Sequence, residues 1–201
     1  MPNHVTNIIT IIADKQRVEE IMEAVKVDDR GPGSLDFEKI IPMPDNIFRG
    51  DLGQEEERLY GKDNWHDWSV DNWGTKWNSY GYEGMPNYDG SNQIRFLSAW
   101  SRVDPIMERL SQMFPDTEFF YQWADENLGC NVGEQYYQNG EVIEECIPQS
   151  QSAQAYEMAA DVMGLDLAEM GYQFDEDEGA YVYADEDMDE DQDEGFGGMK
   201  M

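Results

Sequence analysis

The sequence predicts an α+β fold, in which helices pack on an antiparallel sheet. Three observations support this class: strand patterns and amphipathic helix patterns follow one another along the chain, an Asn139-Gly140 pair separates two strand patterns, and 40% of the 201 residues are hydrophobic. Six Trp and an aromatic fraction of 12% are far from the composition of a disordered chain. A chain of this size can bury a substantial core.

The first predicted unit is a strand followed by a helix. His4–Ile12 is rich in β-branched residues and predicts a central strand. Asp14 is an N-cap residue for a helix that ends before Gly31. The apolar stripe of this helix consists of Val18, Ile21, Met22 and Val25. Phe37–Pro44 then places an apolar run before two prolines, which predicts a short strand or a packed loop.

Two further strands are predicted in the middle of the chain. Asn72–Asn78 alternates aromatic and polar side chains, so Trp73 and Trp77 would share one face of a strand that extends to Tyr80. Gln93–Trp100 is the next extended segment, with Ile94, Phe96 and Trp100 on one face. We expect the two strands to pair as a long hairpin.

A second helix and a fourth strand complete the pattern. Asp104-Pro105 predicts a helix start, Pro115 ends the helix, and Glu118–Ala124 predicts the strand. The order strand, helix, strand, strand, helix, strand is that of a ferredoxin-like βαββαβ sandwich. Residues from about 45 to 71 form a polar insertion, in which Gln54–Tyr60 predicts a helical turn.

The C-terminal third adds elements to this sandwich. Segments 131–138 and 141–147 flank Asn139-Gly140 and predict a hairpin that extends the sheet. Ser152 is positioned to cap a following helix. From Phe174 onward the chain has twelve Asp and Glu residues and a single basic residue, Lys200, which predicts a solvated tail. Tyr181–Tyr183 could still pair as an edge strand before this tail. We therefore divide the chain into a ferredoxin-like domain at 1–147, a helical extension at 148–173 and an acidic tail at 174–201.

The charge of the chain limits its partners. The 44 Asp and Glu against 13 Lys and Arg give a net charge of −31 and a pI near 4.1. This charge repels nucleic acid and anionic membranes and attracts basic protein surfaces. With no targeting or membrane-spanning segment, we expect a cytoplasmic protein. We expect Cys130 and Cys146 to be free thiols, and we predict no metal or cofactor site.

Four motifs occur in order: Met1-Pro2-Asn3-His4-Val5-Thr6-Asn7, Ile41-Pro42-Met43-Pro44, Asn72-Trp73-Gly74-Thr75-Lys76-Trp77-Asn78 and Phe96-Leu97-Ser98-Ala99-Trp100-Ser101. In these motifs the chain resembles the YubB ferredoxin-like domain family of plasmids, phages and bacterial islands. The resemblance covers roughly residues 1–147. The chain departs from it at Leu97 and Ser98, where the family tends to read Glu and Thr. The resemblance implies a ferredoxin-like fold and a mobile-element origin, and it provides no catalytic residues to assign to this chain.

Two groups of side chains are candidate binding residues. The first is Trp73, Lys76 and Trp77, although packing in the core is the more frequent role of such tryptophans. Lys76 is the only basic residue between Asp63 and Ile94, so we expect it to pair with a nearby carboxylate. The second group is acidic and consists of Asp175, Glu176, Asp177, Glu178, Asp185, Glu186, Asp187, Asp189, Glu190 and Asp191.

Catalytic motifs do not emerge from the sequence. It contains no nucleophile elbow, P-loop, dinucleotide fingerprint or HExxH pattern. His66-Asp67 without an evident nucleophile is weak evidence for catalysis. The acids from Asp185 to Glu194 lack the glycine of a calcium-binding EF-hand loop, which favours loose counterion binding. We therefore expect a non-enzymatic protein.

Two functions from different classes remain. The first is an acidic interaction protein of a mobile element that occupies a basic site on a nucleic-acid-binding protein by mimicking phosphate charge. The second is a small cytosolic enzyme or ligand-binding domain with a pocket near Trp73 and Trp77. Acidity that serves only solubility is the simpler explanation of the charge.

Overall fold

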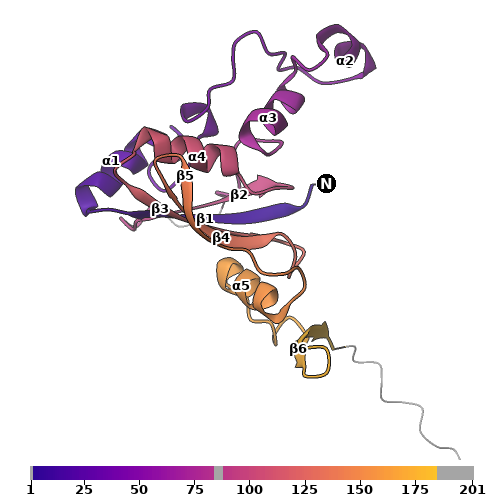
Figure 1. Cartoon of the computed structure of the whole chain (residues 1–201). Coiled ribbons are helices and arrows are strands. Elements are labelled where there is room, and N and C mark those ends of the chain that lie inside the picture. The colour runs from indigo at the N-terminus through magenta and orange to yellow at the C-terminus, as the bar shows by residue number, and fades with distance from the viewer. Residues whose placement is uncertain (1, 84–87, 185–201) are drawn as a thin grey trace, which may run out of the picture.

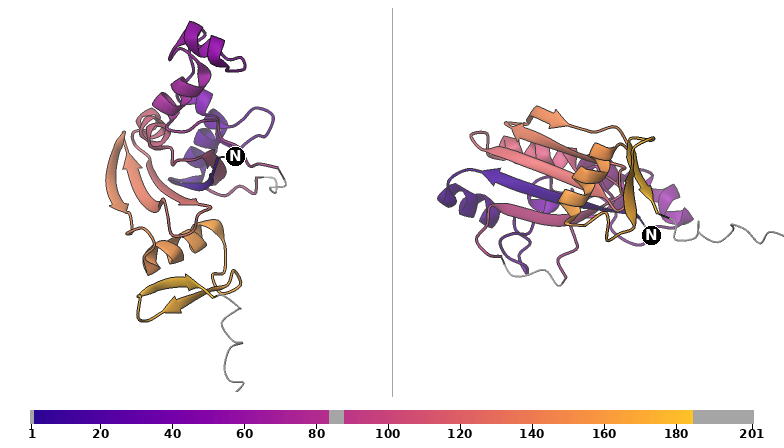
Figure 2. Two further views of the ribbon diagram at one scale, coloured as in Figure 1. Left: turned by 90° about the vertical axis from the view of Figure 1, so that its right-hand side faces the viewer. Right: turned by 90° about the horizontal axis from the view of Figure 1, so that it is seen from below.

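The protein is described by a computed structural model that covers residues 2–83 and 88–184 (Figures 1 and 2). Its main feature is a five-stranded sheet with the strand order β2-β1-β3-β4-β5. All neighbouring strands are antiparallel. The strands are β1 (His4–Ile12), β2 (Gln93–Ala99), β3 (Glu118–Asp125), β4 (Val132–Gln138) and β5 (Glu141–Cys146).

The sheet has the topology of a ferredoxin-like fold, which confirms the predicted fold class. The central strand β1 lies between β2 and β3. The second strand of the βαββαβ pattern is reduced to one residue, because Tyr80 forms an isolated bridge with Leu97 of β2. Backbone hydrogen bonds of 3.1 and 2.8 Å join these two residues. The chain thus places β2 between β1 and Tyr80, as in a split βαβ unit.

The predicted strand from Trp73 to Tyr80 is wrong. Residues Trp65–Trp73 form helix α3, in which Asn64 caps the first turn by accepting the N–H of Asp67. Gly74 ends the helix in the left-handed conformation, with φ of 76°. The expected long hairpin is therefore limited to the bridge at Tyr80.

Two helices cover one face of the sheet (Figure 1). Helix α1 (Lys15–Val25) has Asp14 as its N-cap and buries the four apolar residues predicted from the sequence. Helix α4 (Asp104–Met113) begins one residue earlier than expected, because its N-cap is Val103. Their buried side chains join those of β1, β2 and β3 in one large core, in which Ile9, Phe96 and Tyr121 are fully buried.

A third layer lies on the opposite face of the sheet. Helix α5 (Ala153–Met163) starts at its N-cap Ser152, as predicted, and ends at Gly164 in the left-handed conformation. Its small residues pack on Ala124 and Val132 in a second core cluster. Strands β6 (Tyr172–Asp175) and β7 (Ala180–Tyr183) form a separate hairpin beyond α5 (Figures 1 and 2).

A long excursion connects α1 to β2. It contains the 3₁₀ turn η1 (Phe37–Lys39), helix α2 (Gln54–Tyr60) and α3. The helical turn predicted at 54–60 is confirmed, whereas α3 was not expected. The segment before the two prolines is a packed loop with a 3₁₀ turn, and Phe37 is fully buried. Helix α2 lies at the far end of this excursion, away from the sheet (Figure 1).

The β4–β5 hairpin follows the local turn signal. Gln138 pairs with Glu141, which leaves Asn139 and Gly140 as a two-residue turn. Their φ angles of 50° and 84° are those of a turn that favours Asn-Gly, because an ordinary side chain disfavours positive φ. The predicted hairpin is confirmed, and it places β5 at the edge of the sheet.

Two tyrosines hold buried hydrogen-bond networks together. The Tyr121 hydroxyl donates to Asn7 Oδ1 at 2.7 Å and accepts the Val103 N–H at 3.0 Å. The Tyr137 hydroxyl donates to Gln135 Oε1 at 2.8 Å. Burial raises the pKa of both phenols above the ordinary value, since it disfavours the phenolate.

We expect at least two of the eleven tyrosines to resist ionisation at alkaline pH. A tyrosine in the unfolded chain has a pKa of about 10. The retained protons therefore stabilise the fold below that pH, and this contribution is lost as pH rises through the higher folded pKa values. Tyrosinate absorbance and circular dichroism are followed together during an alkaline titration. Full ionisation before the circular dichroism changes would contradict the expectation, and Tyr121→Phe should reduce the delayed amplitude.

Candidate functional site

Trp73 is part of the core rather than of an exposed site. Only 4% of its surface is exposed. Its indole N–H donates to the carbonyl of Ile41 at 2.8 Å, and its ring meets Trp68 and Phe37 edge to face. This environment fits the structural role that packing considerations favour for Trp73.

Lys76 and Trp77 lie next to Trp100 at the surface. Lys76 Nζ is 4.8 Å from the ring centroid of Trp77 and 5.1 Å from that of Trp100. The prediction that Lys76 pairs with a carboxylate is wrong for the part of the chain that the structure describes. Among those residues the ammonium group forms no ion pair, while Asp71 pairs with Lys62 and Glu83 pairs with Arg30. The negative faces of the two rings attract the cation instead.

Trp100 was not expected in this cluster. The strand pattern placed it beside Ile94 and Phe96, but β2 ends at Ala99. Trp100 has a positive φ of 71°, which turns its backbone away from the strand, and 44% of its surface is exposed. Its N–H donates to the carbonyl of Asn3 at 2.9 Å. The loop after β2 therefore brings the ring to Lys76.

The predicted acidic residues divide into two groups. Asp175 ends β6, and Glu176, Asp177 and Glu178 lie in the turn that leads to β7. The Asp175 carboxylate accepts the N–H groups of Asp177 and Glu178 at 2.8 and 3.1 Å, so it stabilises the turn. The other three carboxylates are exposed. The remaining predicted acids, from Asp185 to Asp191, lie outside the described residues.

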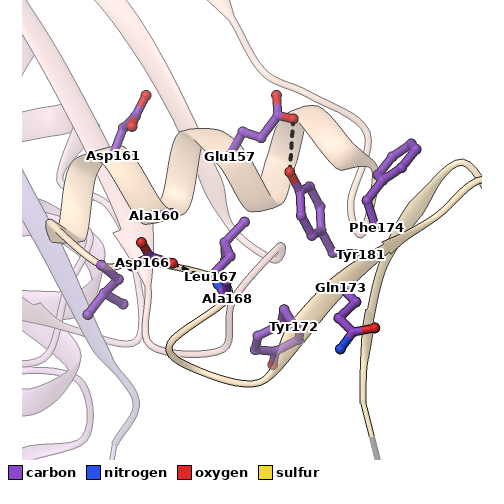
Figure 3. A pocket seen from close by; sticks show the side chains of 11 residues that line it. Glu157, Ala160, Asp161, Asp166, Leu167, Ala168, Tyr172, Gln173, Phe174 and Tyr181 are labelled. Carbon is purple, nitrogen blue, oxygen red and sulfur yellow. Dashed lines mark hydrogen bonds between the residues drawn. The ribbon is translucent and has the colours of Figure 1, made fainter.

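A cleft of about 560 Å³ lies between α5 and the β6–β7 hairpin (Figure 3). Three carboxylates border it: Glu157 and Asp161 from α5, and Asp166 from the loop that follows. Apart from Gln173, the rest of its lining is apolar or aromatic: Ala160, Leu165, Leu167, Ala168, Tyr172, Phe174 and Tyr181. We call this feature the acidic cleft. It combines negative charge with apolar surface.

Hydrogen bonds fix two of the carboxylates in the acidic cleft. The Tyr181 hydroxyl donates to Glu157 Oε1 at 3.3 Å and connects the hairpin to α5 (Figure 3). Partial desolvation together with the Glu157 charge raises the pKa of Tyr181. The Asp166 carboxylate accepts the N–H groups of Ala168 and Glu169. Asp161 is exposed.

The acidic cleft belongs to a stretch of sequence without positive charge. From Leu110 to Met199 the chain has 24 Asp and Glu and no Lys, Arg or His. Glu157, Asp161 and Asp166 were not among the predicted site residues, which came from the densest acidic runs. The absence of basic residues over this stretch is the signal that points to them. The uneven distribution of charge along the chain therefore locates the acidic surface, which the net charge alone does not.

The residues in 2–83 and 88–184 provide no cluster of three His, Cys, Asp or Glu side chains that could hold a metal ion. Cys130 and Cys146 are free thiols, as expected. The helices of these two ranges are too short or too polar to cross a bilayer. His66 Nδ1 lies 3.2 Å from Asp67 Oδ1, and this contact with the imidazole lowers the pKa of Asp67.

The fold and the acidic cleft define a ferredoxin-like α+β protein with an acidic C-terminal extension. A family model described as the ferredoxin-like domain in Api92-like protein matches residues 72–182. The chain belongs to this family. No curated protein and no solved structure matched the chain. The match supports the ferredoxin-like part of the expected resemblance, although its description names Api92-like protein rather than YubB.

The matched range differs from the sandwich in the structure. It starts at the end of α3 and includes α5, β6 and nearly all of β7. It leaves out β1, which is the central strand of the sheet. The domain boundaries predicted at 147 and 173 stay predictions.

Proposed function

We propose that this protein is a non-enzymatic interaction protein that binds a basic surface of another protein through its acidic C-terminal part. The observation that carries the proposal is the charge of residues 110–184, which include 16 Asp and Glu and no Lys, Arg or His. Carboxylates from this stretch border the acidic cleft and occupy the β6–β7 turn. A surface of one sign attracts and orients a partner of the opposite sign.

The proposed target is a basic site that ordinarily holds nucleic acid. Carboxylates of this protein would take the place of phosphate groups, and the interaction would occur in the cytoplasm. The net charge of −31 supports this choice of target. The four sequence motifs resemble the YubB family, and this resemblance implies a mobile-element origin. Mobile elements often carry proteins that block host defences, which supports a nucleic-acid-binding defence protein as the target.

The alternative of a small-molecule site beside Trp73 and Trp77 has less support. Trp73 is buried and its indole N–H is already bonded to Ile41. Lys76 lies over the rings of Trp77 and Trp100. The acidic cleft is elsewhere, between α5 and the β6–β7 hairpin.

The proposal is tested by capture and competition. Full-length protein and a truncation after Ala184, which keeps the β6–β7 hairpin, are immobilised and exposed to lysate of the source organism at low and high salt. We expect capture of a nucleic-acid-binding protein that is lost at high salt, because ion pairs at exposed surfaces are screened. Capture that depends on residues 185–201 would assign the contact to those residues.

Competition distinguishes charge mimicry from incidental binding. The captured protein is purified and loaded with labelled duplex DNA. Addition of the acidic protein should release the DNA, because both ligands need the same basic site. Simultaneous binding of DNA and the acidic protein would contradict mimicry. Absence of any captured protein at low salt would favour the view that the acidity only provides solubility.

A further inference from the structure

The two walls of the acidic cleft have different chemistry. Glu157 and Asp161 are four residues apart on α5, so their side chains lie one helical turn apart on the same face. Both residues are exposed. The opposite wall comes from the hairpin and presents Tyr172 and Phe174 (Figure 3). An occupant of the cleft therefore meets carboxylates on one side and aromatic surface on the other.

The aromatic wall is partly open to solvent at Phe174. The exposed fraction of Phe174 is 51%, although its ring packs edge to face against Tyr181 at a centroid distance of 5.5 Å. Covering such side chains on binding removes apolar area from water and contributes affinity.

The charges around the cleft favour a cationic occupant. No basic residue lines the cleft in the part of the chain that the structure describes. Arg95 approaches α5, but its guanidinium donates to the carbonyl of Met163 at 3.1 Å, at the C-terminal end of the helix. A second copy of the acidic hairpin would bring carboxylates against carboxylates. Repulsion between like charges therefore disfavours self-association through the cleft, and charge complementarity favours a basic partner.

We propose that the acidic cleft binds a basic segment of the partner protein in which Arg or Lys residues alternate with large apolar residues. The cations contact Glu157 and Asp161, and an apolar side chain packs on Phe174. This inference rests on the proposed function and assigns it a docking place. It also makes the interaction more selective than charge attraction alone, because an apolar residue is required next to the cations.

The test uses full-length protein and two fluorescent synthetic peptides of equal length and charge. One peptide alternates Arg with Leu, and the other has Ser in place of each Leu. Fluorescence anisotropy at low salt measures both dissociation constants. We expect the Arg/Leu peptide to bind about tenfold more tightly, since burial of one leucine side chain supplies at least that much affinity.

A pair of variants locates the binding site. Glu157→Gln with Asp161→Asn removes two charges from the cleft and keeps an acceptor for Tyr181. The matched control is Glu141→Gln with Glu144→Gln, which removes two charges from exposed positions on the edge strand β5. We expect about fivefold weaker binding of the Arg/Leu peptide by the cleft variant and less than about twofold by the control.

Each result bears on a different part of the proposal. Equal affinity for the two peptides, or equal weakening by the two variants, would overturn the assignment to the cleft and leave a diffuse acidic surface as the binding agent. Failure of both peptides to bind wild-type protein at low salt would overturn the proposed function as well. Tighter Arg/Leu binding that is lost only in the cleft variant supports both.

Discussion

Replacement of Trp73 by alanine should lower the free energy of unfolding by about 3–5 kcal/mol, the usual cost of truncating a large buried aromatic residue. The indole of Trp73 fills space between Phe37 and Trp68. Its indole N–H also donates a hydrogen bond to the carbonyl of Ile41, and truncation to alanine removes that bond. Urea unfolding followed by circular dichroism measures the change.

Trp77→Ala is the matched control for this prediction. Trp77 is 37% exposed and contacts Lys76 and Tyr80. Loss of an exposed cation–π contact costs about 0.5–1 kcal/mol, so we expect a change of that size. Comparable destabilisation by the two variants would contradict the division of these residues into one core and one surface tryptophan.

A fragment that contains only residues 72–182, the range matched by the family model, should fail to fold cooperatively. It lacks β1, which pairs along seven residues with β2 and along eight residues with β3. Without β1, strands β2 and β3 have no common partner. The fragment also loses Val5, Ile9 and Ile11, which are fully buried. Burial of such side chains supplies about 1.5–3 kcal/mol each.

The control for the fragment is the chain from residue 2 to residue 184, which includes every helix and strand described above. We expect this longer fragment to show a single cooperative transition in urea and dispersed amide signals in NMR spectra. The 72–182 fragment should show neither. Cooperative unfolding of the shorter fragment would mean that its strands reach a stable sheet without β1, and the role assigned to β1 would then be wrong.

The elements that sequence patterns predicted correctly are those with local causes. Helix α1 depends on the cap at Asp14 and on apolar residues spaced at one helical turn. The β4–β5 hairpin depends on Asn139 and Gly140, which adopt positive φ more readily than other residues. In both cases the residues that decide the structure are neighbours in the chain, so no tertiary information was needed.

The segment around Trp73 shows why other elements could not be predicted in this way. Alternating aromatic and polar residues fit a strand, yet the same residues form the end of α3 and a loop. Tertiary packing decides between the two, since the helix buries Ser69 and Trp73, one turn apart, against the core. A prediction from sequence periodicity considers only residues that are close in the chain, so it cannot choose between these two conformations.

The candidate site also has one property that the sequence predicted and another that only the folded chain revealed. Composition was sufficient to predict that the protein would attract positive charge, because net charge acts at long range and needs no particular geometry. The acidic cleft needed the folded chain: Glu157 and Asp161 come from α5, and Phe174 comes from a hairpin that turns back beneath that helix. These residues line one cleft only because the folded chain brings the hairpin back to α5, and side-chain spacing along the chain does not encode such an arrangement.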